Sequence, residues 1–88
     1  MSRLHLSRPP IFALAARIAQ RSGIPTAKLY GHGKSDPVVH ARQLAYEAAF
    51  LQHYSIGEIS REFGKHHTTI MHGIRAVEKR RAENGYSA

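Results

Sequence analysis

The side chains best suited to chemistry gather between residues 66 and 79. They bring hydroxyl, imidazole and cationic groups together in the order His66, His67, Thr68, Thr69, His72, Arg75 and Lys79. Hydroxyls and imidazoles can meet the base edges or phosphates of a nucleic acid, a threonine methyl can touch the thymine methyl, and arginine can pair with guanine or phosphate. A solvated helix without special function shows the same residue types. The spacing of these residues and the elements around them must therefore distinguish a DNA-binding helix from an ordinary exposed one.

The apolar residues of this stretch recur with a helical period. Ile70, Ile74 and Val77 follow one another at intervals of four and three, which predicts a helix that begins near His67 and buries these side chains. The backbone amides of its first turn point toward any anion beyond it. The side chains on roughly the opposite face are polar or cationic, namely Thr68, His72, Arg75 and Lys79.

A second, shorter helix is predicted directly before this one. Ser55 followed three residues later by Glu58 matches a capping box, and Gly64 directly after Phe63 supplies a left-handed C-terminal position. Two helices joined by a tight glycine turn, the second of them basic, outline the motif that lays its second helix in the DNA major groove. We therefore expect a DNA-binding helix-turn-helix over about residues 55–81.

Other chemistries find less support in the sequence. The spacing of His66, His67 and His72 does not place two ligands four apart on one helix face, and no cysteine or carboxylate completes a metal set. Ser55 and Ser60 have no recognisable base and acid partners, which argues against a hydrolase. We expect no metal, no cofactor, no catalytic residue and no ATP site, because a glycine-rich phosphate loop is absent from these 88 residues.

The elements that must position the motif are also predicted to be helical. Pro10 can open a helix that ends near Ser22, Thr26 can cap a short turn, and Asp36 with Pro37 can cap and open a helix that runs to about residue 52. A chain of 88 residues supports one core. The sequence predicts an all-α bundle of four to six helices over residues 10–88, preceded by a flexible basic arm at 1–9.

Composition indicates the class of partner. The net charge of +7 and a pI near 10.4 favour a polyanion, either nucleic acid or an anionic membrane. The apolar run at residues 11–16 is too short for a secretory signal, and no stretch approaches the roughly 20 apolar residues of a membrane span. Together with the absence of cysteine, these features predict a cytoplasmic, nucleoid-associated protein.

The same residues resemble a known family, the C-terminal DNA-binding domain of the bacterial chromosomal replication initiator DnaA. The resemblance covers about residues 11 to 80. Its most specific parts are Phe63-Gly64, the run His67-Thr68-Thr69-Ile70-Met71-His72, Arg75, Glu78 and the earlier Ala41-Arg42-Gln43.

This resemblance implies an all-helical domain in which His67, Thr68, Thr69 and His72 face the major groove, while Lys34 belongs to a basic loop that reaches the minor groove. Three features depart from the family pattern. His66 replaces an acidic residue at the helix start, the turn over residues 63–67 is one residue shorter, and Asp36 occupies the usual place of the loop arginine. A carboxylate there would be repelled by the negative minor groove.

We interpret the chain as a monomeric binder of double-stranded DNA in bacterial replication initiation or its regulation, with the initiator itself as a further possible partner. The alternatives are a stand-alone transcription regulator, which would dimerise on a palindrome, and a module that binds a replication protein. The candidate DNA-binding residues are Lys34, Arg42, Lys65, His66, His67, Thr68, Thr69, His72, Arg75 and Lys79.

Overall fold

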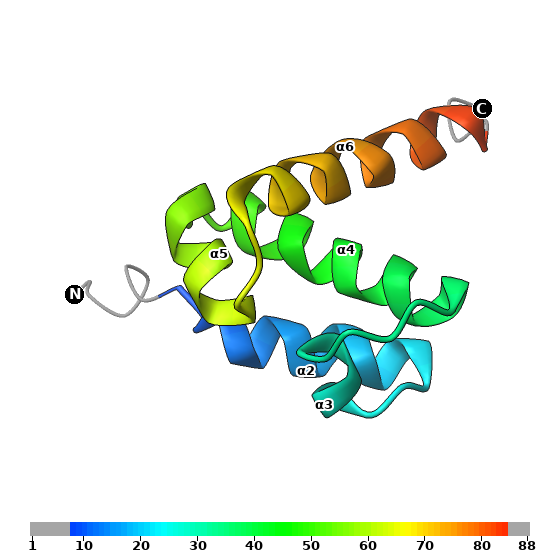
Figure 1. The fold of residues 1–88 in the computed structure, drawn as a ribbon, viewed down its shortest axis with the longest axis horizontal. Coiled ribbons are helices and arrows are strands. Elements are labelled where there is room, and N and C mark those ends of the chain that lie inside the picture. Colours follow the sequence, from blue (N-terminus) through cyan, green and yellow to red (C-terminus); the bar gives the residue numbers. More distant parts are fainter. Residues whose placement is uncertain (1–7, 85–88) are drawn as a thin grey trace.

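The computed structural model describes residues 8–84, in which five helices and no strand occur (Figure 1). Helix α4 crosses the middle of the molecule and packs against α2 on one side and α6 on the other. The predicted all-α class is confirmed. The helices are α2 (Ile11–Ser22), α3 (Thr26–Leu29), α4 (Asp36–Leu51), α5 (Ile56–Phe63) and α6 (His67–Glu83).

The helix-turn-helix is built from α5 and α6. The predicted capping box is present, because Glu58 N–H donates to Ser55 Oγ over 3.0 Å and Ser55 N–H donates to the Glu58 carboxylate over 2.8 Å. Gly64 ends α5 with φ of 63°, a left-handed conformation in which a side chain would be strained. The sequence signals for this motif are therefore confirmed in position and in geometry.

The predicted starts of α3 and α4 are wrong by one residue. Ser35, not Asp36, is the residue before the first helical turn of α4, and Asp36 and Pro37 are its first two residues. Likewise Pro25, not Thr26, is the residue before the first turn of α3, and Thr26 is the first residue of that helix. Neither cap position uses its side chain as an acceptor. Asp36 instead lies within the first turn of α4, where the helix dipole favours a carboxylate.

All five helices contribute side chains to the core, with α4 between α2 and α6. Ile70, Ile74 and Val77 are buried, as predicted from their spacing. Tyr46 of α4 is 1% exposed and meets the ring of Phe63 edge to face at 5.1 Å between centroids. A small residue is required beside this ring, because a Cβ atom on Gly73 would lie 2.8 Å from Tyr46 Cδ2. Gly73 thus allows the close approach of α6 to α4.

The start of the described chain is attached to the turn between α4 and α5. The Arg8 guanidinium lies 3.7 Å from the centroid of the Tyr54 ring and donates to the carbonyl of His53 over 3.0 Å. Tyr54 in turn donates its hydroxyl to the carbonyl of Pro9 over 2.7 Å. The last two residues of the predicted arm therefore contact the domain, and residues 1–7 lie outside the described residues.

Candidate nucleic-acid interface

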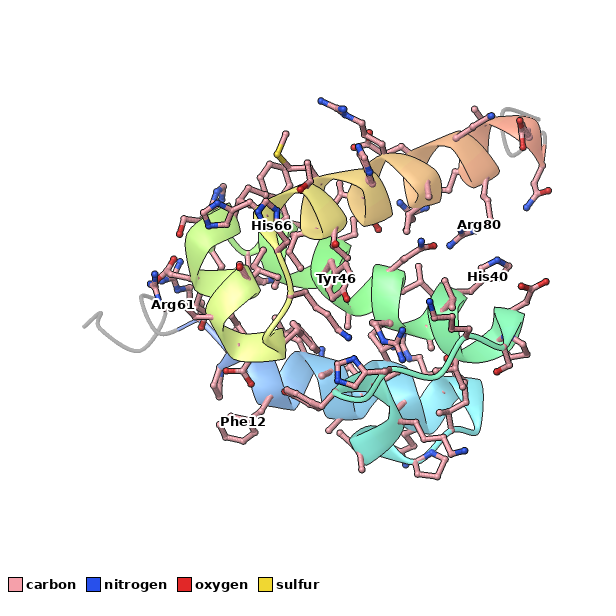
Figure 2. All side chains as sticks on the ribbon, viewed as in Figure 1. Phe12, His40, Tyr46, Arg61, His66 and Arg80 are labelled. Carbon is pink, nitrogen blue, oxygen red and sulfur yellow. The ribbon has the colours of Figure 1, made fainter. Side chains whose placement is uncertain are left out.

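The polar stripe predicted on the second helix of the motif lies on the surface of α6. Its four residues are exposed, as are the three candidates at the start of the helix, while the opposite side of the helix faces the core. Figure 2 shows His66 at the point where the turn from α5 enters α6. The exposed candidates at this helix are His66, His67, Thr68, Thr69, His72, Arg75 and Lys79.

A groove of about 570 Å³ joins this helix to the loop before α4. Lys34 lines it from the loop, Gln43 from α4, Lys65 from the turn and Thr69 from α6. Tyr46 lies beneath it, between α4 and α6 (Figure 2). The fold therefore brings cations and hydroxyls from three separate parts of the sequence to one concave surface.

Lys65 connects the helix-turn-helix to the loop directly. Its ammonium donates to the carbonyl of Gly31 over 2.9 Å and to Nδ1 of His32 over 3.0 Å. Desolvation lowers the pKa of the Lys65 ammonium, and the positive charges of Arg42 and Lys34 lower it further. Lys65 thus helps to set the distance between the loop and the start of α6.

Arg42 is placed differently from the other candidates. It is 8% exposed, and its guanidinium donates to the carbonyls of Lys28, Leu29 and Gly33 over 3.0, 3.2 and 3.1 Å. These bonds satisfy carbonyls at the end of α3 and in the following loop. The structure therefore places Arg42 beneath the loop that carries Lys34, where it positions that loop, and its contact with DNA stays a prediction.

The basic residues at the end of α6 divide into two kinds. Arg80 donates to the side-chain oxygen of Gln43 over 2.8 Å, and Arg81 forms an ion pair with buried Glu47. Both of these arginines tie α6 to α4. The side chain of Lys79 is 76% exposed, and its ammonium lies 3.9 Å from the carboxylate of the exposed Glu83. Lys79 is therefore accessible to a phosphate.

Two residues of the groove lie outside the predicted set of DNA-binding residues. His32 contributes a ring nitrogen to the Lys65 contact, and its glycine-rich surroundings gave no signal for this role. Tyr46 is buried with a hydroxyl that has no hydrogen-bond partner among the described residues. Burial raises the pKa of Tyr46 to about 12, although Arg42 opposes the rise. Its position on an apolar stripe predicted only core packing.

Residues 8–84 contain neither a metal-binding cluster nor a membrane-spanning helix. No three histidine or carboxylate side chains there converge in a way that could hold a metal ion. No helix in that range combines the length and hydropathy needed to cross a lipid bilayer.

The fold and this surface define an all-α DNA-binding domain of the helix-turn-helix class. Comparison with known families narrows this class: the family described as bacterial DnaA protein helix-turn-helix matches residues 13–77. The chain belongs to this family, which confirms the resemblance predicted from the sequence.

Relatives in two bacteria agree with this assignment. The chromosomal replication initiator protein DnaA of Cereibacter sphaeroides is 37% identical over 65 residues, which cover 72% of this chain and 14% of that protein. The protein of the same name in Corynebacterium aurimucosum is 43% identical over 58 residues, covering 64% of this chain and 11% of that protein. The chain thus spans only a small part of the length of the relatives it matches.

Proposed function

We propose that this chain binds double-stranded DNA with α6 and the loop before α4, in the initiation of bacterial chromosome replication or in its regulation. One observation carries the proposal: the exposed Thr69 of α6 lines the same groove as Lys65 of the turn and Lys34 of the loop. The net charge of +7 supplies the attraction to phosphate. The family and its relatives support the setting in replication.

The two parts of the surface would perform different tasks. With α6 in the major groove, Thr68, Thr69 and His72 meet base edges, whereas Lys79 lies farther along the helix and meets phosphate. Lys34 extends the contact from the loop to the neighbouring backbone. Asp36 stands two residues later at the exposed start of α4, so the loop adds less positive charge than an arginine at that position would.

The chain acts by binding and not by catalysis under this proposal. It would work as a monomer at the nucleoid, in the cytoplasm, and its partners would be duplex DNA and, beside it, the replication initiator. Such binding would allow the chain to occupy DNA sites or to assist the initiator at them. Light scattering on the free and the DNA-bound chain tests the monomer, because a dimer on a palindrome would have twice the mass.

Binding to duplex DNA at several salt concentrations tests the electrostatic part of the proposal. If about six phosphates are neutralised, the logarithm of the association constant should fall with the logarithm of salt at a slope of roughly −5. The measurement uses fluorescence anisotropy with a labelled duplex of random sequence. A slope near zero would remove the proposal, because no interface of this charge can bind phosphates without releasing counterions.

Alanine variants test the division between base reading and phosphate contact. Thr69→Ala and His72→Ala should narrow the difference in affinity between a selected duplex and a random one, by about 1–3 kcal/mol at most. Lys79→Ala should weaken the binding of both duplexes alike. Equal losses on both duplexes in all three variants would show that α6 does not read bases.

A further inference from the structure

The first turn of α6 is closed by an imidazole. His66 precedes the helix with extended backbone angles of −67° and 151°, and its Nδ1 accepts the backbone N–H of Thr68 over 3.2 Å. The hydroxyl oxygen of Thr68 lies within hydrogen-bond distance of the same ring nitrogen. Both side chains are exposed on the surface proposed to face DNA. The sequence predicted only that His66 removes a carboxylate here, whereas the ring supplies a different acceptor.

The two contacts together fix the positions of the protons. A backbone N–H can only donate, so Nδ1 must present its lone pair, and the ring proton must then reside on Nε2. Because that lone pair also faces the Thr68 hydroxyl, the hydroxyl donates its proton to the ring. A threonine hydroxyl has a single proton. Thr68 therefore keeps its two oxygen lone pairs and its methyl group for contact with a ligand, and has no donor left.

We propose that His66 is a positioning residue that determines specificity, because its neutral imidazole makes Thr68 read DNA as an acceptor and a methyl group. This inference rests on the proposed placement of Thr68 in the major groove. There, the donors on base edges are the amino groups of adenine and cytosine, and the methyl group belongs to thymine. Guanine offers only acceptors in that groove. A neutral His66 thus disfavours guanine opposite Thr68.

Protonation of His66 reverses this arrangement. The imidazolium carries a proton on both nitrogens, so Nδ1 can no longer accept from the backbone or the hydroxyl of Thr68. The cap on α6 is lost, and the freed hydroxyl can donate to guanine. Because the contacts of Thr68 require the neutral ring, we expect the base preference at this position to depend on pH.

The groups near His66 determine which control variants are needed. The ring centroid of His67 lies 6.1 Å from that of His66. Lys65 precedes His66 in the turn and Arg61 belongs to α5, and both are cationic residue types. The carboxylates of α5 are engaged elsewhere, Glu58 with Ser55 and Glu62 with the hydroxyl of Tyr30. His67→Gln is therefore the control for a neighbouring imidazole.

The test begins with selection of a preferred duplex from a randomised DNA library by the whole chain at about pH 8. Affinities for this duplex, for single-base variants and for random duplex are then measured at about pH 8 and about pH 5.5. We expect the ratio of selected to random affinity to fall roughly three- to tenfold on acidification, the value of one hydrogen bond. Discrimination against guanine should weaken at one base position only.

Three variants decide between the possible causes. His66→Asn keeps a good cap with an acceptor oxygen that does not titrate, so its affinity ratio should stay constant within about twofold. His67→Gln should retain the full response of the unmodified chain. Thr68→Val keeps the methyl group but lacks the hydroxyl, and should lose both the discrimination against guanine and its pH dependence. Circular dichroism checks that each variant retains its helices.

Two results would overturn the inference, and they can be told apart. A pH response in His66→Asn equal to that of the unmodified chain would exclude His66 as the cause, while leaving the DNA-binding surface intact. Unchanged base preference in Thr68→Val at both pH values would mean that Thr68 does not face a base. That second result would also contradict the proposed placement of α6 in the major groove.

Discussion

Replacement of Gly73 by alanine tests the close packing of α6 on α4. The added methyl carbon would lie 2.8 Å from Tyr46 Cδ2 and 3.2 Å from Gln43 Cγ. Tyr46 cannot move away easily, because it is 1% exposed and meets the ring of Phe63. Overpacking of this kind costs about 1–3 kcal/mol. Alanine in a helix recovers about 1 kcal/mol relative to glycine, which leaves a net loss of up to about 2 kcal/mol.

Gly57 offers a matched control within a helix. A Cβ atom there would meet its nearest neighbours at 3.7–3.9 Å, which is ordinary contact. Gly57→Ala should therefore be neutral or stabilising by up to about 1 kcal/mol. Urea unfolding followed by circular dichroism measures both free energies of unfolding, and each kcal/mol corresponds to about 4–8 °C in melting temperature for a domain of this size.

The two substitutions should thus change stability in opposite directions. Gly73→Ala should also weaken the binding of duplex DNA, because movement of α6 away from α4 widens the groove that Thr69 and Lys34 share. If Gly73→Ala proved as stable as Gly57→Ala, the close approach of the two helices would not be a requirement of the fold. The reasoning from the contact distances would then be wrong.

Three further substitutions test local features. The hydrogen bond from the Ser55 backbone lowers the pKa of Glu58 in the folded chain. The stability that this carboxylate contributes is therefore present above the ordinary glutamate pKa and is lost as pH falls through the lowered pKa of the folded state. Glu58→Gln should reduce this dependence of the free energy of unfolding on acid, measured by urea unfolding. His53 has φ of 70°, a left-handed conformation that strains a residue with a side chain. His53→Gly should therefore raise the free energy of unfolding by about 0.5–1 kcal/mol, seen as a higher melting temperature. A lower melting temperature would contradict backbone strain at this residue. A lysine at position 42 cannot form the three hydrogen bonds of the Arg42 guanidinium. Arg42→Lys should therefore lower the free energy of unfolding by about 1–3 kcal/mol and also weaken the binding of duplex DNA. An unchanged affinity would mean that the position of the loop does not depend on Arg42.

The parts of the fold that sequence predicted well are those with local causes. The capping box of Ser55 and Glu58, the glycine at 64 and the helical period of Ile70 and Ile74 each act within a few residues, and each is found as expected. The start of α4 was misplaced by one residue because serine and aspartate at 35 and 36 are both favourable before a helix. Local preference could not choose between them.

The site was less predictable because distant segments build it. The contact of Lys65 with Gly31 and the bonds from Arg42 to the end of α3 arise only when the helices have packed. His53 adopts a left-handed conformation that its residue type does not signal, and its carbonyl accepts from Arg8. The acceptor role of His66 likewise depends on the ring orientation in the folded chain.

We expect α6 and the loop before α4 to bind duplex DNA together. A nuclear magnetic resonance titration of the whole chain with a selected duplex tests this joint binding most directly. The account predicts that backbone amide signals of residues 66–72 and of residues 32–35 shift at the same DNA concentrations. Signals from the exposed face of α2 should stay in place. Shifts confined to α2 and α3, or shifts of α6 without the loop, would contradict the claim.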